Sequence, residues 1–181
     1  MKKHAIVLAA LIGAASAQAQ VYGTIAGGSS HLAVDCTGVS SCNSSDTGVK
    51  LVGGYEFGNG FSLEAGYISF GKFGAADGTL ALTAKPTAFT LGGAFAIPFN
   101  TSWGMNARLG IAQVKTKIDA RSGSATGSDS QSKAKAYAGL GLTYAVSKTV
   151  KFELGVDSTQ AEFAGEKGTL RLISLGATFA F

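Results

Sequence analysis

The sequence predicts an all-β fold, an eight-stranded antiparallel up-and-down transmembrane β-barrel. Three observations predict it. Apolar residues recur at every second position in eight segments, which is the period of β-strands with two unlike faces. Short turns alternate with long polar stretches between these segments. Charged residues within the segments gather on the less apolar face.

Residues 1–19 have the pattern of a secretory signal peptide. Lys2 and Lys3 give a positive start, and 5–15 is an apolar run too short to span a bilayer. Ala17-Gln18-Ala19 is a small-x-small cleavage site. We expect cleavage after Ala19, with Ala17 as the alternative, and an uncleaved anchor is the other interpretation. The barrel domain is then 20–181.

Composition narrows the class of protein. About 160 residues remain after cleavage, enough for one domain. Charged residues make up 14% of the chain, against ~25% in ordinary soluble domains. The formal charge of +4 includes Lys2 and Lys3, which leaves too small an excess to indicate nucleic acid binding. No later run approaches the ~20 apolar residues of a transmembrane helix.

Four segments alternate most clearly and four with less contrast. In the clearest case Val49 and Leu51 share one face, and Lys50 lies on the other. Each segment has at least about nine residues, the length a tilted strand needs to cross a bilayer. The clear segments are 49–57, 61–70, 103–112 and 150–158, and the others are 21–29, 89–97, 138–146 and 170–181.

The connections between segments are of two unlike kinds. Short turns occupy 58–60, 98–102 and 147–149. Long stretches rich in Gly, Ser, Thr, Asp and Lys occupy 35–47, 74–86, 119–134 and 159–168, which we expect to be loops. In outer-membrane barrels the short turns face the periplasm and the long loops face outside.

Aromatic residues favour a membrane barrel over a soluble, lipocalin-like one, in which the apolar face would point inward. Those at or beside the short turns are Phe57, Phe61, Phe99, Trp103, Tyr144 and Phe181. They fit an aromatic girdle at one membrane interface. Tyr67, Phe70 and Phe73 lie near the other end. The alternative interpretation is ordinary strand aromatics.

The charged residues of the segments predict an interior ion cluster. They are Lys50, Glu56, Glu64, Arg108, Lys151, Glu153 and Asp157, all on the less apolar face. Facing lipid at the midplane, an Arg or Lys would cost ~2–4 kcal/mol. We expect Arg108 near the centre of the cluster with Glu64 as its first partner. The alternative is a solvated sheet face. Eight strands enclose room only for side chains, so solute diffusion is not the expected function.

Two stretches resemble a known family. The closing "ISLGATFAF" matches the terminal strand, and "KLVGGYEFGNGFSLEAGY" is similar to the second hairpin, of small eight-stranded outer-membrane barrels of the OmpA transmembrane-domain and OmpX type. The resemblance covers Val21 to Phe181. It implies the outer membrane of a Gram-negative bacterium, a barrel-only member, and places for Glu64 and Arg108 in the interior cluster.

The resemblance also implies a role for the last strand. This strand would be the signal that the barrel-assembly machinery recognises, and Phe181, Phe179 and Leu175 would be the residues read. It must also pair with the strand at Val21, because an unpaired edge is not tolerated in lipid.

The cysteine and histidine residues give little indication of a metal or catalytic site. Cys36 and Cys42 are expected to form a disulfide within one loop, since an exported protein meets an oxidising compartment. Two cysteines alone do not make a metal site. His31, near Ser29, Ser30 and Asp35, is the best catalytic dyad that the chain offers, but a rim histidine is the simpler interpretation. No HExxH, P-loop or Rossmann pattern is present. We therefore expect no enzyme, no cofactor and no metal.

Cations near the long stretches suggest contacts with lipopolysaccharide. Lys115, Lys117 and Arg171 share the outward register, and charge-assisted hydrogen bonds to phosphate are strong. Solvated loop charge is the alternative. We therefore expect a monomeric, non-enzymatic barrel among outer-membrane lipids, with a structural, adhesion or interaction role and a host or phage ligand at its loops. The alternatives are a narrow low-conductance pore or a lipid A-modifying enzyme using His31.

Overall fold

The computed structural model describes residues 20–33, 40–78, 80–123, 125–163 and 166–181. The predicted signal peptide and Cys36 lie outside them. Among the described residues, no helix has the length and apolarity needed to cross a bilayer. The strands are β1 (Gln20–Ala33), β2 (Ser41–Asn43), β3 (Ser45–Glu56), β4 (Phe61–Ser69), β5 (Phe73–Asp77), β6 (Leu80–Pro98), β7 (Trp103–Ser122), β8 (Ala125–Ala145), β9 (Val150–Phe163) and β10 (Glu166–Ala180).

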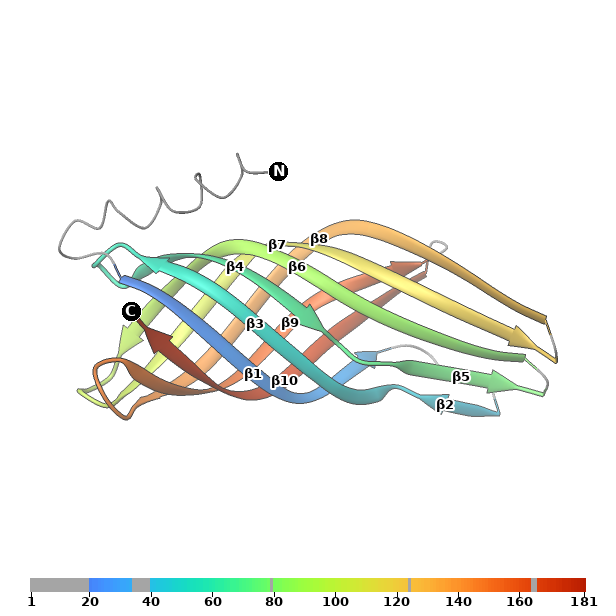
Figure 1. The fold of residues 1–181 in the computed structure, drawn as a ribbon, viewed down its shortest axis with the longest axis horizontal. Helices are drawn as coiled ribbons and strands as arrows, with labels where there is room; N and C mark the ends of the chain where they lie inside the picture. The colour runs from blue at the N-terminus through green and yellow to red at the C-terminus, as the bar shows by residue number, and fades with distance from the viewer. Residues whose placement is uncertain (1–19, 34–39, 79, 124, 164–165) are drawn as a thin grey trace, which may run out of the picture.

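Eight of these strands close into a ring, which confirms the predicted fold class. The ring runs β1, β3, β4, β6, β7, β8, β9, β10 and back to β1, and each neighbouring pair is antiparallel (Figure 1). Tyr22 pairs with Ala180 at the closure, and the amide of Phe181 donates to the carbonyl of Val21 at 2.9 Å. Closure pairs the strand edges that lipid would otherwise leave unsatisfied.

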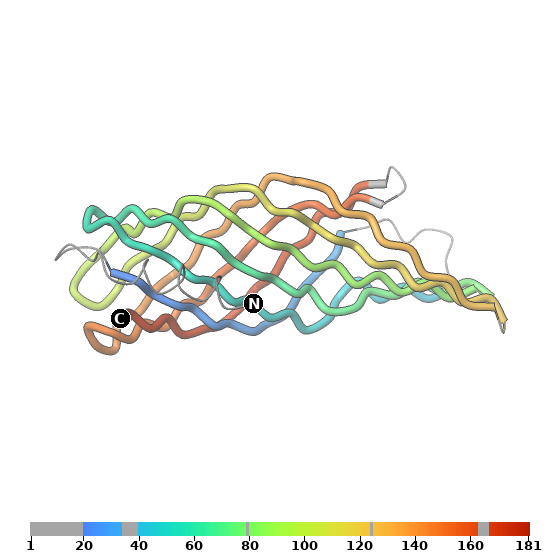
Figure 2. Tube along the Cα trace, turned by 45° about the horizontal axis from the view of Figure 1, so that its top comes forward, coloured from blue at the N-terminus to red at the C-terminus, as the bar shows by residue number. Residues whose placement is uncertain are grey.

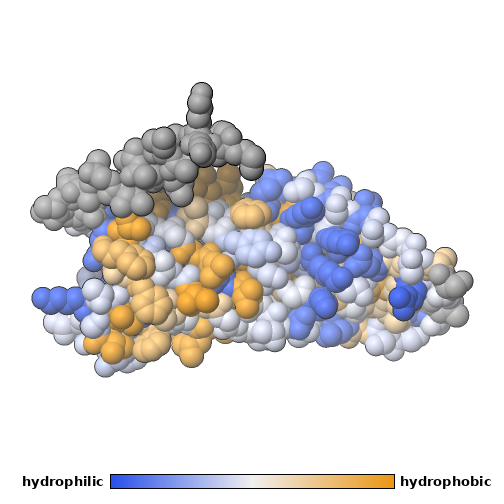
Figure 3. Space-filling model, viewed as in Figure 1, coloured by the Kyte–Doolittle hydropathy of each residue, from blue (hydrophilic) through white to orange (hydrophobic). Residues whose placement is uncertain are grey.

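The outer surface of the ring is apolar. Ile25, Leu109 and Leu175 are 58%, 71% and 64% exposed, whereas the next residues inward, such as Arg108 and Ser174, are 2% exposed. Figure 3 shows hydrophobic residues gathered over the half of the barrel that carries the short turns, and hydrophilic residues over the other half. We call these the turn end and the hairpin end. The apolar band is the surface that a membrane barrel presents to lipid.

Aromatic residues surround the turn end. Phe57 stacks on Phe61 with ring centroids 5.8 Å apart, and Trp103 packs against Tyr144 at 4.9 Å. These four side chains are all exposed. Trp103 and Tyr144 suit the boundary between headgroups and hydrocarbon, because each combines an apolar ring with one polar group.

The expected loops are in large part strand, which corrects the sequence interpretation. β6 begins at Leu80, β7 continues to Ser122, and Ser122 pairs directly with Ala125 of β8. β5 pairs with both β2 and β6. Together β2, β5 and the hairpin-end parts of β6, β7 and β8 form a five-stranded sheet that extends beyond the barrel, which we call the arm (Figures 1 and 2).

The reason for this error is physical. Beyond the membrane most of the outward face of the arm meets water, so polar residues such as Thr83, Lys117 and Ser130 occupy strand positions there. Period-two alternation fades when the outer face no longer has to be apolar, although the hydrogen-bonded ladder continues. The β9–β10 hairpin is likewise strand up to Phe163 and from Glu166.

The terminal residue gives a prediction about assembly. Phe181 is 82% exposed, so its ring contributes little packing to the folded barrel. We expect that deleting Phe181 lowers the folded fraction in cells much more than it lowers the resistance of purified barrels to urea. The folded fraction is measured from the gel mobility shift on boiling. Phe57→Ala, in the same aromatic girdle, is the control, and equal losses in both assays would contradict an assembly signal.

Candidate functional site

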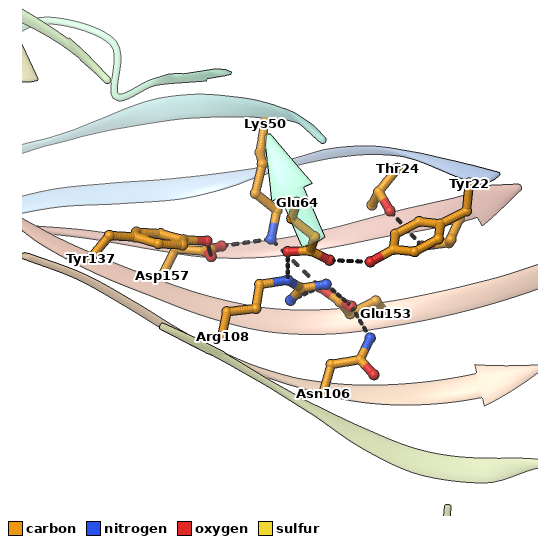
Figure 4. Close-up of polar contacts among 10 residues, drawn as sticks. Tyr22, Thr24, Lys50, Glu64, Asn106, Arg108, Tyr137, Glu153 and Asp157 are labelled. Atoms are coloured by element: carbon orange, nitrogen blue, oxygen red, sulfur yellow. Dashed lines mark hydrogen bonds and ion pairs between the residues drawn. The ribbon is translucent and has the colours of Figure 1, made fainter. Parts of the chain in front are cut away.

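Inward-facing residues of four strands meet in a buried ion cluster (Figure 4). Its charged members are Lys50 on β3, Glu64 on β4, Arg108 on β7, and Glu153 and Asp157 on β9. Every one of these side chains is 8% exposed or less. Strand alternation places them inside, since the residues on either side of each one point outward.

Arg108 makes the most contacts within the cluster. Its Nε donates to Glu64 Oε2 at 2.9 Å, and its Nη1 and Nη2 donate to the two oxygens of Glu153 at 2.8 and 2.7 Å. The fork-to-fork pairing with Glu153 is the strong, geometrically specific form of this ion pair. Tyr22 adds a hydrogen bond to Glu64 at 2.6 Å, and Asn106 adds one to Glu153 at 3.1 Å.

Lys50 connects a second pair of carboxylates. Its Nζ, fully buried, lies 2.6 Å from Asp157 Oδ2 and 3.5 Å from Glu153 Oε1. Tyr137 donates its hydroxyl hydrogen to the other oxygen of Asp157 at 2.5 Å. Three carboxylates thus share two cations and two tyrosine hydroxyls. Buried charges are tolerated when they are paired and hydrogen-bonded in this way.

Two glycines make room for the cluster. A Cβ at Gly141 would lie 2.7 Å from the carboxyl carbon of Glu153. A Cβ at Gly54 would lie 2.2 Å from the ring of Tyr22. Part of the high glycine content of the chain therefore serves close approach between interior side chains and facing backbone.

Two of the seven charged residues predicted for the ion cluster lie outside it. Glu56 and Lys151 are half-buried at the turn end, where they line a cavity of about 40 Å³ together with Tyr22 and Asn106. The structure thus brings together five of the seven predicted charges. Sequence reasoning did not name Tyr22, Tyr137 or Asn106. The inward register of Tyr22 and Asn106 was the available signal, while Tyr137 falls one residue before a predicted segment.

Directly above the ion cluster, toward the hairpin end, the interior becomes apolar. Ile68 pairs with Lys50, and Leu172 pairs with Asp157, so the two layers are adjacent. This apolar cluster consists of Leu32, Ile68, Phe70, Phe73, Ala88, Ala112, Val114, Tyr137, Ala161, Leu170 and Leu172. Its central side chains are completely buried. The sequence placed Phe70 and Phe73 near this end, and the structure shows that both point inward, 0% and 3% exposed.

The predicted lipopolysaccharide contacts divide between two sides of the barrel. Lys115 and Lys117 lie on the outward face of β7 and are exposed. Arg171 is exposed on β10, opposite His31 of β1, three places from β7 in the ring. The structure therefore groups Lys115 with Lys117 but not with Arg171.

Further cations accompany the two lysines on the arm. Lys85 lies directly opposite Lys117 in the β6–β7 register, and Arg121 lies two residues beyond Asp119. Asp119 sits among these residues, 2.7 Å from the Nζ of Lys85 and 3.5 Å from that of Lys117. The hydrogen bond from Lys85 holds the pKa of the Asp119 carboxyl below its usual range.

The predicted dyad is not assembled. His31 Nδ1 lies 3.0 Å from the hydroxyl of Ser45 on the neighbouring strand, and both are exposed. Ser30 points inward and donates to the backbone carbonyls of Asp46 and Phe70. Asp35 lies outside the described residues. Within the described part of the chain, no group of three or more His, Cys, Asp or Glu side chains is arranged to hold a metal ion.

The predicted disulfide falls partly outside the structure. Cys42 lies on β2 and is disulfide-bonded. Cys36 is not among the described residues, so its pairing with Cys42 stays a prediction.

The sequence profile of the OmpA-like transmembrane domain matches residues 13–160. The chain belongs to the OmpA-like transmembrane domain family. It is therefore an outer-membrane β-barrel protein of the Gram-negative type, as the resemblance implied. Members of this family are generally non-enzymatic. No curated protein matches the chain.

Solved structures share the fold of this OmpA-like barrel. Ail, the attachment invasion locus protein of Yersinia pestis, is 19% identical over 91% of this chain and 99% of its own, with a TM-score of 0.61, in a complex with the heparin analogue sucrose octasulfate. Neisserial surface protein A is 12% identical over 89% and 97%, with a TM-score of 0.59. OprG of Pseudomonas aeruginosa is 16% identical over 90% and 95%, with a TM-score of 0.55.

The ion cluster of this OmpA-like barrel gives a prediction about stability. Arg108→Met leaves the buried Glu64 and Glu153 without their main cation, which lowers the free energy of unfolding by ~3–5 kcal/mol. Urea titration in lipid vesicles, followed by the fluorescence of Trp103, measures this. Arg171→Met, on the outer surface, is the control with little effect. Adding Glu64→Gln and Glu153→Gln to Arg108→Met should recover most of the loss, and equal effects of Arg108→Met and Arg171→Met would contradict the cluster's role.

The apolar cluster gives a prediction about conductance. With Phe70, Leu170 and Leu172 completely buried across the interior and the ion cluster below them, no continuous water path is expected. Planar-bilayer recordings of the intact barrel should therefore show no channels above those of protein-free membranes. Reproducible unitary currents from the purified barrel would show that the interior rearranges and would favour the narrow pore.

Proposed function

We propose that this protein is a non-enzymatic surface interaction protein, in which the barrel is the membrane anchor and the arm binds anionic sugars. One observation carries the proposal: cations concentrate on the outward face of the arm. They are Lys85, Lys115, Lys117 and Arg121 of β6 and β7, together with Lys72, which lies just before β5, and we call this set the basic face. Asp119 is the carboxylate placed among them.

The shape of the basic face suits a ligand with many oxygen atoms. Lys72, Lys85 and Arg121 line one open cavity of about 660 Å³. Thr126 and Ser128 of the adjacent strand line it too and supply hydroxyl groups. Phosphate and sulfate esters accept several charge-assisted hydrogen bonds at once, which is what this combination of cations and hydroxyls offers.

Charge repulsion within the basic face also supports a ligand. Like charges directly opposite one another across two strands are destabilising, and Lys85 faces Lys117 in this way. Asp119 offsets part of that repulsion. A bound polyanion would offset the rest, so binding and the relief of repulsion act in the same direction.

The position of the lysines supports contact with lipopolysaccharide as well. Ile111 is the last large apolar residue on the outward face of β7, and Lys115 follows four residues later. At ~3.4 Å per residue Lys115 lies roughly 14 Å from Ile111 along the tilted strand, and one outward position beyond the level of the exposed Phe89 on β6, where lipopolysaccharide phosphates are expected. Arg171 would contact the same layer on the opposite side of the barrel.

A structural relative supports the choice of ligand class. Ail has the same fold, and its structure is a complex with sucrose octasulfate, a polysulfated sugar. We therefore assign an adhesion-type role to the arm, with sulfated or phosphorylated glycans as ligands. His31 fits a rim residue rather than a catalytic base, because its hydrogen-bond partner Ser45 is exposed beside it and no third residue orients the pair among the described residues.

Export and assembly complete the proposal. Residues 1–19 would be removed at the inner membrane, and Phe181, Phe179 and Leu175 would present the closing strand to the barrel-assembly machinery. The mature barrel would act as a monomer.

Binding of sucrose octasulfate to the barrel in nanodiscs tests the proposal by calorimetry. Lys117→Gln with Arg121→Gln should weaken binding several-fold, Asp119→Asn should strengthen it, and added salt should weaken it by screening. Lys148→Gln in a short turn is the charge-matched control. Loss of binding in the control alone, or binding insensitive to both salt and the arm variants, would contradict the proposal.

The same assay has an expected pH profile. The hydrogen bond from Lys85 lowers the pKa of the Asp119 carboxyl below the usual 3.8, so Asp119 stays ionised from pH 5 to 8. Affinity for the polysulfate should be flat across that window. It should rise only below pH 3.8, where Asp119 becomes neutral and the basic face gains net positive charge.

A further inference from the structure

A second concave site lies inside the hairpin end, away from the basic face. It is a cavity of about 370 Å³, bounded by described residues of β1, β2, β5, β6, β7, β9 and β10, and we call it the outer vestibule. Its apolar lining includes Leu32, Phe73, Leu82, Ala84, Ile118 and Ala161. Its size falls within the ~300–1,000 Å³ of small-molecule sites.

The floor and walls of the vestibule have different exposure. Leu32, Phe73 and Ala161 belong to the buried apolar cluster and form the floor. Leu82, by contrast, is 39% exposed although it lies on the inward face of β6. The inward faces of β6 and β7 thus stay apolar at Leu82, Ala84 and Ile118 where their outward faces become basic, whereas the inward face of β8 carries Asp129, Gln131 and Lys133. Apolar surface left in water forgoes about 25 cal/mol per Å², so an apolar ligand here would be stabilised.

A buried hydroxyl points to a polar group on that ligand. Thr116 lines the vestibule and is 5% exposed, and its Oγ1 has no hydrogen-bond partner among the described residues. Buried polar atoms are nearly always paired, and an unpaired one is costly. A ligand oxygen that accepts from Thr116 would remove this cost.

A cation and an amide narrow the ligand class. Lys167 and Asn43 line the same cavity, and Lys167 is exposed. Glu162 lies opposite Lys167 in the β9–β10 register, and its ion pairs are with Lys133 and Lys135. A hydroxyl donor, an amide and an ammonium group around one apolar cavity together match a carboxylate attached to an apolar body. A neutral hydrocarbon would leave Thr116 unpaired, and a multiply charged sugar would place its charges against Leu82 and Ile118.

We propose that the outer vestibule binds a medium-chain fatty carboxylate. The carboxylate accepts a hydrogen bond from Thr116 and faces Lys167, and the chain lies against Phe73, Leu82 and Ile118. This site is separate from the basic face, so either can fail without the other.

Photolabelling distinguishes the vestibule from general partition into lipid. The probe is decanoate carrying an alkyl diazirine, added to the full-length barrel in nanodiscs and activated by light. Mass spectrometry should find label on peptides that contain Phe73, Leu82 or Ile118, and excess decanoate should displace it. Label confined to lipid-facing positions such as Leu109 and Leu175 would overturn the proposal.

Variants test the contacts. Ala84→Trp fills the vestibule and should lower the labelling at least about fivefold, whereas Ala81→Trp, on the opposite face of the same strand, should not. Thr116→Val removes the hydroxyl at nearly constant volume, so labelling at subsaturating probe should fall about fivefold, the size of one lost hydrogen bond, without loss of urea resistance. Because this variant is nearly isosteric, it tests the site even where Ala84→Trp does not fold.

A comparison of a charged with an uncharged probe tests the role of Lys167. Lys167→Gln should weaken labelling by the decanoate probe and leave labelling by the matching decanol probe unchanged. Equal labelling of wild type, Ala84→Trp and Thr116→Val by the decanoate probe would overturn the proposal.

Discussion

Closure of the sheet between β1 and β10 is the constraint on which the rest of the structure depends. In hydrocarbon each backbone amide and carbonyl needs a partner within the protein. The ring supplies these partners, and every strand then has one face toward lipid and one toward a narrow interior. Charges such as Lys50 and Arg108 are held inside for this reason, and the small space forces them into contact with the carboxylates of Glu64, Glu153 and Asp157.

The two interior layers contribute in different ways. A buried ion network adds little net stability, because desolvation offsets much of the attraction, yet removing one partner is costly. The network around Arg108 therefore acts chiefly to exclude other registers, since a slipped strand would leave a charge unpaired or facing lipid. The apolar layer around Phe70 and Leu172 gains from burial and dispersion instead. Together the layers make the barrel a solid anchor.

Period-two patterning was enough to predict the eight strands, the lipid-facing band and most of the ion cluster. Arg108 and Glu64 could be placed because each lies among apolar neighbours that must face lipid. The apolar layer was missed because the inward face of β4 changes from Ser62 and Glu64 to Ile68 within one strand, and only the register with β3 shows which charges lie beside it. The arm was missed because Lys117 and Ser130 lie in strands where the outer face no longer selects apolar residues.

Tyr137 shows a further limit of sequence reasoning. Its hydroxyl completes the hydrogen bonding of Asp157, but it lies at the edge of a segment with weak contrast, and its partner is 20 residues away on another strand. The outer vestibule has the same character, because Thr116, Lys167 and Asn43 come from three strands whose proximity depends on closure of the ring.

The arm is a hydrogen-bonded ladder, and this has a consequence for how the surface of the protein can diverge. Two residues added to each strand of a hairpin would lengthen it by ~7 Å and keep every side chain on its original face. A single added residue would exchange the outward and inward faces beyond that point. Length changes in pairs are thus compatible with both the basic face and the vestibule. The arm can vary in reach while the anchor, its interior charges and its lipid contacts stay the same.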